Sequence, residues 1–480
     1  MGSLDFIKPI AHLLPEVKAP ERPPNLNERL MWTGVAILIF FVMYNVAAVG
    51  VSSQLGTLDF LSVVTAARLG SLVTTGIGPI VLASIFLQLF VGAKIINVNM
   101  SDPEEKATFH ATQKVLAVLL CFFEAAVYVL FARIPLSTPY VFGGLGITEF
   151  MVIAQIALGS LVLLYLDEVV SKHGLGSGIS LFIAAGVSLS VVGGAISLFT
   201  ADNGVIATLS QGGSEALPNA IIALAPLFFT ILVFLIVVYA EGIKVELPLA
   251  FERARGLGGK FPIKFLYVSN IPVILASALL LNMQFFTAGL AGASFVVKEL
   301  GNVDIMPYIA YVDSSKQVRD GALYLITPIY RSVNQNFLAY VTQLLTGSTP
   351  ILHIPQVVHV IVYVVFMVLL CILFGQFWVE TTGMGPKEVA AQLSKSGLQI
   401  PGYRRDPRIV EKVLERYIPM ITILGSAFVG LLASMADLTG ALGTGTGILL
   451  TVGIVHKLYE ELEAQRAFDS YPAFASLFGD

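Results

Sequence analysis

The chain has 480 residues, of which 56% are hydrophobic and only 12% are charged, and its formal net charge is −4. An ordinary soluble domain carries charge on roughly 25% of its residues and could not bury this much apolar surface. The composition therefore excludes a water-soluble protein of two or three domains and predicts a protein of the lipid bilayer.

The N-terminal segment, residues 1–30, carries five prolines and charges of both signs. It has no short apolar core ahead of a small-residue cleavage site, so we expect no cleavable signal peptide. Because the first apolar stretch begins only near Met31, this segment is predicted to stay in the cytosol.

Ten apolar stretches follow, each close to the ~20 residues that a helix needs to cross a bilayer. They lie at 31–50, 77–96, 112–131, 148–170, 179–200, 218–240, 264–286, 352–379, 417–437 and 441–459. With the N-terminus inside, 22 of the 28 Lys and Arg residues fall on the inner side, as the positive-inside rule requires. The sequence thus predicts an all-α membrane protein with ten spans and both termini in the cytosol.

The stretch 57–70 lies between the first two spans and is too short and too weakly apolar to cross the membrane. A short helix that reaches back into the membrane fits it, if protein or a water-filled cavity surrounds that helix. An interfacial surface helix fits equally well. Its apolar stripe consists of Phe60, Val63, Val64 and Ala67, with Asp59 and Arg68 on either side.

Charged residues are scarce within the spans. Glu124 lies midway along the third span, and Asp167 and Glu168 lie at the inner end of the fourth. Spans one, two and five to nine are interpreted as essentially uncharged. Because intramembrane ionisable groups usually mark ion pathways, a proton- or sodium-coupled transporter should show several. The pattern counts against that class.

Two inner loops, 241–263 and 380–416, are long and rich in arginine. Long loops in compact proteins tend to be functional. These could bind anionic lipid, a protein or nucleic acid phosphate. Charge that only sets the topology explains them equally well.

Motifs for catalysis or cofactor binding are missing from the sequence. It has no GxxxxGK[ST] phosphate loop, and its six histidines are scattered. GLGSG at 174–178 and GTGTG at 443–447 open apolar spans, where small residues favour close helix packing. Cys121 and Cys371 lie in apolar stretches and are predicted to be buried free thiols. We expect no enzyme, no cofactor and no metal site.

Ordered motifs along nearly the whole chain resemble the SecY family, the central (alpha) subunit of the protein-conducting channel, in its archaeal form. They are LPEV at 14–17, WTG at 32–34, GIGPIV at 76–81, QLFVG at 88–92, LDEVVSKHGLGSGIS at 166–180, VELPLA at 245–250, PIKFLYVSNIPVILASAL at 262–279, FWVETTG at 377–383 and GALGTGTGILLTV at 440–452. The resemblance implies two pseudo-symmetric inverted halves around an hourglass pore. These are an N-terminal half at 31–205 and a C-terminal half at 206–460, with a cytosolic tail at 461–480.

The resemblance also assigns roles to individual residues. The stretch 57–70 becomes a plug with Phe60, Val63, Val64, Ala67 and Arg68, while Glu124 and Asn270 become polar positions of a lateral gate. Close relatives carry a threonine where this chain has Leu82, so Glu124 has no hydrogen-bond partner there. The apolar pore ring consists of Ile77, Val81, Ile179, Ile183, Ile274 and Leu450, and the ribosome-binding residues are Arg255, Arg404 and Arg405.

The implied function is a passive channel for unfolded secretory polypeptides, with lateral insertion of membrane helices, driven by a partner such as a translating ribosome. The implied partners are the small subunits SecE (gamma) and Sec-beta, the ribosome, nascent chains with signal sequences and membrane lipid. The implied location is the cell (plasma) membrane. The sequence allows two alternative functions. A ten-span secondary transporter is disfavoured by the scarcity of charged residues in the spans, and a scaffold without a pore would be excluded by a conductance measurement.

Overall fold

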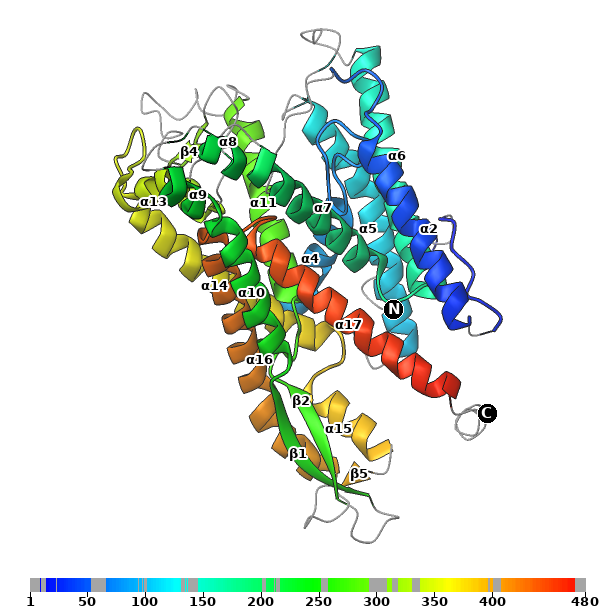
Figure 1. The fold of residues 1–480 in the computed structure, drawn as a ribbon. Helices are drawn as coiled ribbons and strands as arrows, with labels where there is room; N and C mark the ends of the chain where they lie inside the picture. The colour runs from blue at the N-terminus through cyan, green and yellow to red at the C-terminus, as the bar shows by residue number, and fades with distance from the viewer. Residues whose placement is uncertain are drawn as a thin grey trace, which may run out of the picture.

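The protein is a bundle of long helices with a small sheet at one end (Figure 1). The computed structural model describes residues 9, 14–22, 24–52, 66–93, 95–96, 98, 102–130, 134, 136, 146–200, 204–210, 212, 216–251, 258–292, 309–312, 318–329, 337–395, 398–399 and 407–470.

Every predicted span falls on a helix. The helices are α2 (Leu26–Asn45), α4 (Gly78–Gly92), α5 (Pro103–Leu130), α6 (Ile147–His173), α7 (Gly178–Thr200), α10 (Ala225–Glu241), α11 (Ile271–Gly292), α14 (Gln356–Thr381), α16 (Pro407–Leu438) and α17 (Gly445–Ser470). Within the described part of the chain, seven helical stretches are long and apolar enough to cross a membrane. The all-α, multi-span architecture is therefore confirmed.

Several boundaries differ from the predicted ones for local reasons. The seventh span begins at Ile271 and not at 264, because Ser269 has a positive φ of 55°, which a helix cannot contain. The sixth span is divided at Leu224 into α9 (Ala216–Ala223) and α10. Pro226 lies in the first turn of α10, where a missing N–H costs nothing.

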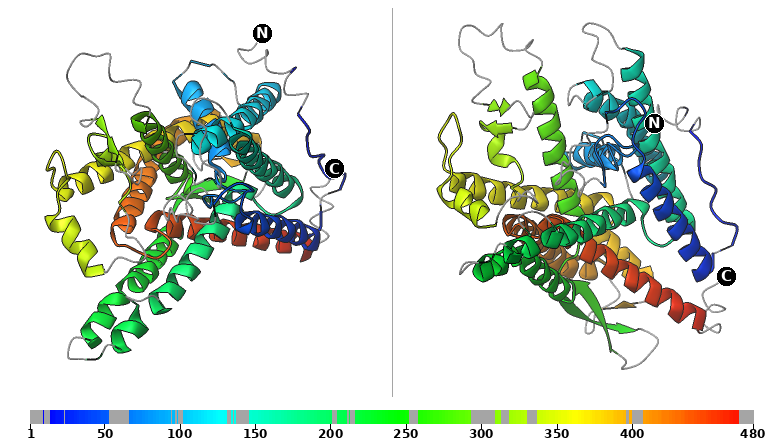
Figure 2. Two further views of the ribbon diagram at one scale, coloured as in Figure 1. Left: turned by 90° about the horizontal axis from the view of Figure 1, so that it is seen from above. Right: turned by 45° about the horizontal axis from the view of Figure 1, so that its top comes forward.

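The helices share one large hydrophobic core. It includes Phe40 of α2, Ile80 of α4, Phe182 of α7, Tyr363 of α14 and Leu449 of α17. In Figure 1, α7 and α17 run side by side although they are far apart in the sequence. Figure 2 shows the green helices α8 (Val205–Ser210), α9 and α10 projecting from this body.

The same close backbone crossing occurs once in each half. An ideal Cβ on Gly159 of α6 would lie 1.9 Å from the carbonyl oxygen of Leu72, and one on Gly425 of α16 would lie 2.6 Å from that of Phe265. Leu72 and Phe265 each lie six residues before a helix, α4 and α11 respectively. A serine follows each glycine. The fourth span (α6) therefore contacts the segment that leads into the second span (α4), and the ninth span (α16) contacts the segment that leads into the seventh (α11) in the same way. An inverted repeat requires this correspondence.

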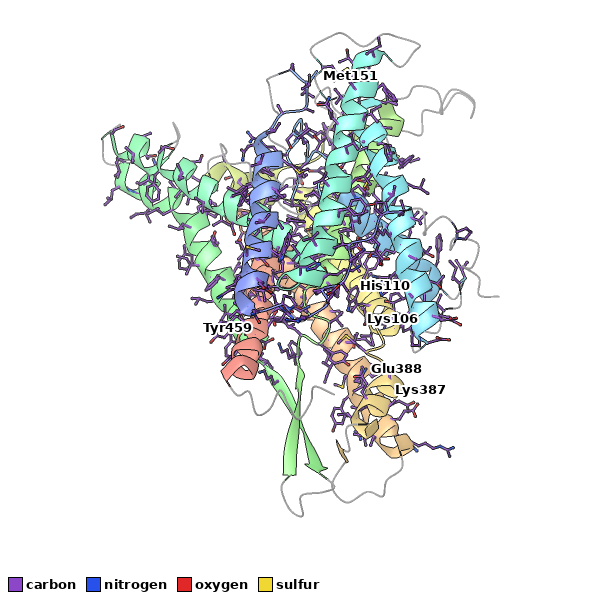
Figure 3. The ribbon with its side chains drawn as sticks, turned by 90° about the vertical axis from the view of Figure 1, so that its right-hand side faces the viewer. Lys106, His110, Met151, Lys387, Glu388 and Tyr459 are labelled. Atoms are coloured by element: carbon purple, nitrogen blue, oxygen red, sulfur yellow. The ribbon has the colours of Figure 1, made fainter. Side chains whose placement is uncertain are left out.

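The two long loops form one folded unit at the lower end of Figure 1, called here the hairpin end. Strand β1 (Lys244–Phe251) pairs with β2 (Gly258–Lys264) and with β5 (Leu398–Gln399), both antiparallel. Helix α15 (Pro386–Lys395) packs against α16 over a small core of its own, which includes Leu393. The two loops named from the sequence, 241–263 and 380–416, therefore contribute to one sheet. Figure 3 shows Lys106 and Lys387 toward this end and Met151 at the opposite end.

A second folded segment covers the opposite end. It contains β3 (Tyr311–Val312), β4 (Val318–Asp320), η2 (Tyr324–Ile326) and α13 (Phe337–Thr346). Asp320 is fully buried, and its Oδ2 accepts hydrogen bonds from the backbone N–H of Ile351 (2.7 Å) and of Leu352 (2.8 Å). Burial alone raises the pKa of Asp320, but these backbone hydrogen bonds outweigh it and lower the pKa below its ordinary value.

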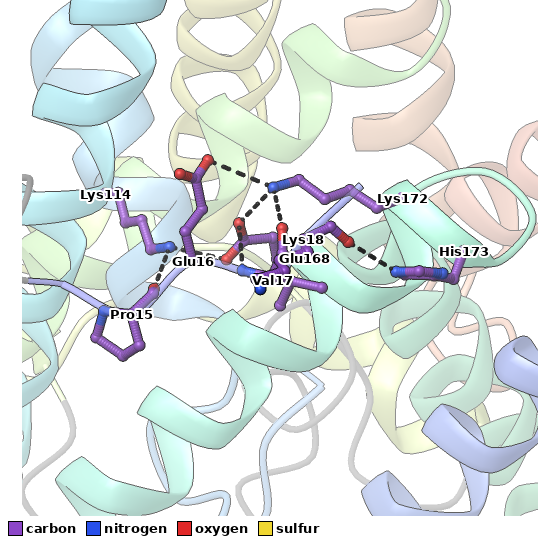
Figure 4. A network of polar contacts seen from close by, with 8 residues as sticks. All are labelled: Pro15, Glu16, Val17, Lys18, Lys114, Glu168, Lys172 and His173. Atoms are coloured by element: carbon purple, nitrogen blue, oxygen red, sulfur yellow. Dashed lines mark hydrogen bonds and ion pairs between the residues drawn. The ribbon is translucent and has the colours of Figure 1, made fainter. Parts of the chain in front are cut away.

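The N-terminal segment lies across the ends of α5 and α6 (Figure 4). Glu168 accepts hydrogen bonds from Lys114 (2.8 Å), from Lys172 (2.9 Å) and from the backbone N–H of Val17 (3.2 Å). Both lysines also donate to backbone carbonyls of the segment, Lys114 to Pro15 and Lys172 to Val17. Glu168, predicted only as a charge at the end of a span, therefore anchors the segment.

The glycine crossing yields a test of packing. Gly159→Ala would place a methyl group against the Leu72 carbonyl oxygen, and overpacking of this kind costs ~1–3 kcal/mol. We expect a lower midpoint of thermal unfolding for the purified protein in detergent. Gly193→Ala in α7 is the matched control, because nothing lies within 4 Å of its added Cβ. Equal midpoints for the two variants would contradict the crossing.

Candidate functional site

Six aliphatic residues that the resemblance assigns to a pore ring share one structural position. Each lies between the N-cap and the sixth residue of its helix. Ile77 and Val81 open α4, Ile179 and Ile183 open α7, Ile274 opens α11, and Leu450 opens α17. Four helices thus present their first turns to one region.

The six side chains belong to one apolar cluster. Ile77, Val81, Ile183 and Leu450 are buried within the large core, while Ile179 and Ile274 are partly buried and pack against it. All six residues, separated by up to 373 positions in the sequence, therefore lie in or against the same hydrophobic core. We call these six residues the waist.

Glycine at the start of three of these helices allows each of them to approach a neighbouring helix closely. Ideal Cβ atoms would lie 2.5 Å from the Asp167 Cα for Gly178 and 2.1 Å from the Ala436 carbonyl carbon for Gly445. For Gly78, a Cβ would lie 2.9 Å from a carboxylate oxygen of Glu124. No larger residue fits at these three starts unless the neighbours move, which confirms the packing role predicted for the glycine-rich motifs at 174–178 and 443–447.

The predicted plug is described only in part. Phe60, Val63 and Val64 lie outside the described residues, while Ala66 and Ala67 are buried in turns beneath the waist helices. The guanidinium of Arg68 donates a hydrogen bond to Asn45 Oδ1 (2.8 Å) and lies 5.8 Å from the ring of Tyr44. The C-terminal end of the plug segment is therefore tied to α2.

The two predicted gate residues contact different helices. Glu124 of α5 is 3% exposed, lies against α4, and its Oε1 has no hydrogen-bond partner among the described residues. Asn270 is also 3% exposed, and its amide donates to the Leu449 carbonyl of α17 (3.1 Å). Leu82 is buried in the core and can offer Glu124 no hydrogen bond.

Two buried acids lie at the ends of spans. Asp437 falls within the predicted ninth span, which is interpreted from the sequence as uncharged, while Glu241 lies one residue beyond the predicted sixth span at 218–240. Glu241 is the last residue of α10 and is 5% exposed; Asp437 lies near the end of α16 and is 2% exposed. A comparison of Asp437 with Asp167 could have found it, since each precedes a glycine-rich turn that opens the next span. We found no equivalent sequence signal for Glu241.

The predicted ribosome-binding arginines, Arg255, Arg404 and Arg405, lie outside the described residues. The strands beside them are described, and the register pairs Ala250 with Gln399. Strands β1 and β5, which directly precede the two arginine-bearing segments in the chain, therefore lie side by side in a single sheet.

Within the described residues, no group of three or more His, Cys, Asp or Glu side chains could hold a metal ion. Cys121 and Cys371 are buried free thiols, as predicted.

Comparison with known proteins identifies relatives over the full length of the chain. The SecY family model matches residues 71–459. Protein translocase subunit SecY of Methanocaldococcus jannaschii is 41% identical over 470 residues, which cover 98% of each chain. A solved structure of a protein-conducting channel superposes with a TM-score of 0.79 at 39% identity, covering 98% of this chain and 99% of that one. A structure of Sec61 in the canine ribosome-channel complex from the endoplasmic reticulum gives a TM-score of 0.76 at 39% identity and the same coverage.

The Oε1 of Glu124, which has no hydrogen-bond partner among the described residues, yields a prediction. Burying a polar group without a hydrogen bond costs ~1–3 kcal/mol, so Glu124→Leu should raise the midpoint of thermal unfolding in detergent. The control is Asn282→Leu in α11, where the buried amide bonds the Ala278 carbonyl of its own helix (2.9 Å). That change should not stabilise the protein. A lower midpoint for Glu124→Leu would contradict this prediction.

Proposed function

The chain belongs to the SecY family and is the channel subunit of a protein translocase, and we propose that its substrates cross the membrane through the waist. The observation that carries this proposal is that six aliphatic residues, from the beginnings of four helices, lie in or against one hydrophobic core. The protein is not an enzyme, so the force that moves the polypeptide comes from a partner.

An aliphatic waist suits an unfolded substrate of any sequence. It offers no hydrogen-bonding side chain to which a passing chain would adhere, and flexible aliphatic groups can close around residues of different size. A narrow apolar constriction also dewets and resists ions when no chain is present. The plug segment 57–70 would support this seal from the outer side.

Membrane-protein helices would leave the channel sideways, between α4 and α5 on one side and α11 and α14 on the other. These pairs are in contact across the core, α4 with α11 and α14. The buried Glu124 carboxyl lies at this boundary, on the α4–α5 side. A polar group there lowers the cost of parting the helices, because it gains hydration when the gate opens.

The hairpin end would face the cytosol and dock the ribosome. The charge asymmetry along the chain supports this orientation, and the structure of Sec61 in a ribosome-channel complex supports the partner. Arg255, Arg404 and Arg405 would contact ribosomal RNA, since the guanidinium fork matches phosphate. Both chain termini would then be cytosolic, and the host bilayer would be the cell membrane.

Two small single-span subunits, SecE and Sec-beta, are proposed to complete the channel, with SecE bracing both halves. Many apolar side chains on the outer faces of the bundle are exposed in the isolated chain, including Leu38, Leu119 and Val192. Such faces suit lipid or single-span helices equally well.

The waist yields a conductance prediction. Changing Ile77, Val81 and Ile183 to Asn together should make the resting channel leak ions and accept weaker signal sequences. Each truncated aliphatic loses of order 2–5 kcal/mol of packing, and a polar group also lets water wet the constriction. Deleting 57–70 alone should have a smaller effect. The measurement is resting conductance in planar bilayers.

The control for this test places the same three Asn residues at exposed positions, Leu38, Leu119 and Val192, which are 64%, 62% and 57% exposed. If the control leaks and the waist variant stays as tight as the unaltered channel, the waist assignment is wrong.

The arginines that follow β1 and β5 in the chain yield a binding prediction. Reversing Arg255 and Arg404 to Glu should weaken ribosome binding, and the affinity of the unaltered protein should fall as salt rises. Resting conductance should not change. If the double variant binds ribosomes with unaltered affinity in sedimentation assays, the prediction is wrong and these arginines only set the membrane topology.

A further inference from the structure

An aspartate caps the helix that follows it at an equivalent place in each half. Asp167 of α6 accepts a hydrogen bond at Oδ1 from the backbone N–H of Ile179 (2.8 Å) in the first turn of α7. Asp437 of α16 accepts one at Oδ1 from the backbone N–H of Thr446 (2.8 Å) in the first turn of α17. Each bond joins the end of one span to the start of the next.

The turns between the paired helices also match. Each contains the pattern Leu-Gly-Ser/Thr-Gly, at 175–178 and at 442–445. The leucines are 4% and 5% exposed, and the following glycines, Gly176 and Gly443, have φ values of 69° and 71°. The two turns are therefore one structural unit used twice, in opposite orientations with respect to the membrane if the halves are inverted.

This repeat relates two waist residues to each other. Ile183 lies four residues after the capped Ile179, and Leu450 lies four residues after the capped Thr446. Residues four apart share one face of a helix. Each aspartate therefore holds the helical turn that immediately precedes a waist side chain.

We propose that Asp167 and Asp437 are positioning residues of the channel, which hold Ile183 and Leu450 at the waist by capping the helices that carry them. This inference rests on the proposed role of the waist. The two caps act from opposite sides of the constriction, one in each half.

The chemistry of the caps fits this role. The first N–H groups of a helix have no partner within it, and a carboxylate at that end also interacts favourably with the helix dipole. Hydrogen bonds to a charged acceptor are about twice as strong as neutral ones. Without the cap, the first turn of α17 would expose unpaired N–H groups in the protein interior and would fray, together with Leu450.

Asp437 has further partners that connect the cap to a third helix. Its Oδ2 accepts hydrogen bonds from the Thr446 hydroxyl (2.5 Å) and from the Tyr363 hydroxyl of α14 (3.0 Å). Since α14 also contacts α4, the Leu450 turn is linked to the helix on the other side of the waist. On the other cap, Ser177 Oγ donates to Asp167 (3.3 Å).

The test compares Asp437→Ala and Asp437→Asn in the full-length channel, with Ser434→Ala as the matched control. Ser434 is buried one turn earlier on α16 and bonds only carbonyls of its own helix. Resting conductance in planar bilayers should rise roughly tenfold for the Ala variant, the fold-change expected from one charge-assisted hydrogen bond. The Asn variant should leak less, because its amide oxygen still accepts the Thr446 N–H, and the control should stay tight.

A second readout separates positioning from plain stability. A disulfide between Ile183→Cys and Leu450→Cys should form more slowly under mild oxidation when Asp437→Ala is also present, and at the unaltered rate with Ser434→Ala. If the Asp437 variants melt earlier but leave conductance and crosslinking unchanged, the residue is only structural and the proposal is overturned. If the waist Asn variant itself does not leak, the proposed waist fails and the positioning role falls with it. A leaking waist variant beside tight Asp437 variants overturns the positioning role alone.

Discussion

Helices that begin inside the bundle impose the main constraint on this structure. A helix that starts at the membrane surface leaves its first N–H groups to water, but α4, α7, α11 and α17 start at the waist. Each unsatisfied backbone group in a water-free interior costs several kcal/mol. The segments that lead into these helices must therefore carry their own hydrogen-bonding groups.

The buried turn before α4 shows how this requirement is met. Thr74 Oγ1 accepts a hydrogen bond from Gly70 N–H (3.0 Å) and donates to the Ser71 carbonyl (2.6 Å), while Ser71 Oγ accepts from Val73 N–H (3.1 Å). Thr75 then bonds Ser160 of α6. These side chains are almost completely buried. The polar residues in the core thus stabilise backbone that is not helical, and the apolar residues are left to form the waist.

The same constraint explains why the two halves resemble each other in their details. Gly159 and Gly425 hold the backbone entering α4 and α11, and Asp167 and Asp437 cap α7 and α17. A fold that starts four helices at its centre needs a close crossing and a cap for each half. An inverted repeat supplies both from one pattern, and the waist lies where the two copies meet.

The sequence by itself determined the all-α membrane class, because composition and the length of the apolar stretches leave no other way to satisfy the backbone in lipid. The motifs along the chain also identified the family, and the resemblance assigned the waist residues. Only the tertiary structure decided that the two arginine-rich loops form one sheet, since β1 and β5 pair across about 150 residues and no local pattern encodes that contact. The same is true of Asp437, whose partners lie 9 and 74 residues away. From the sequence alone, an acid at the end of an apolar stretch is interpreted as a charge at the membrane boundary. Only the fold shows which N–H groups donate hydrogen bonds to it.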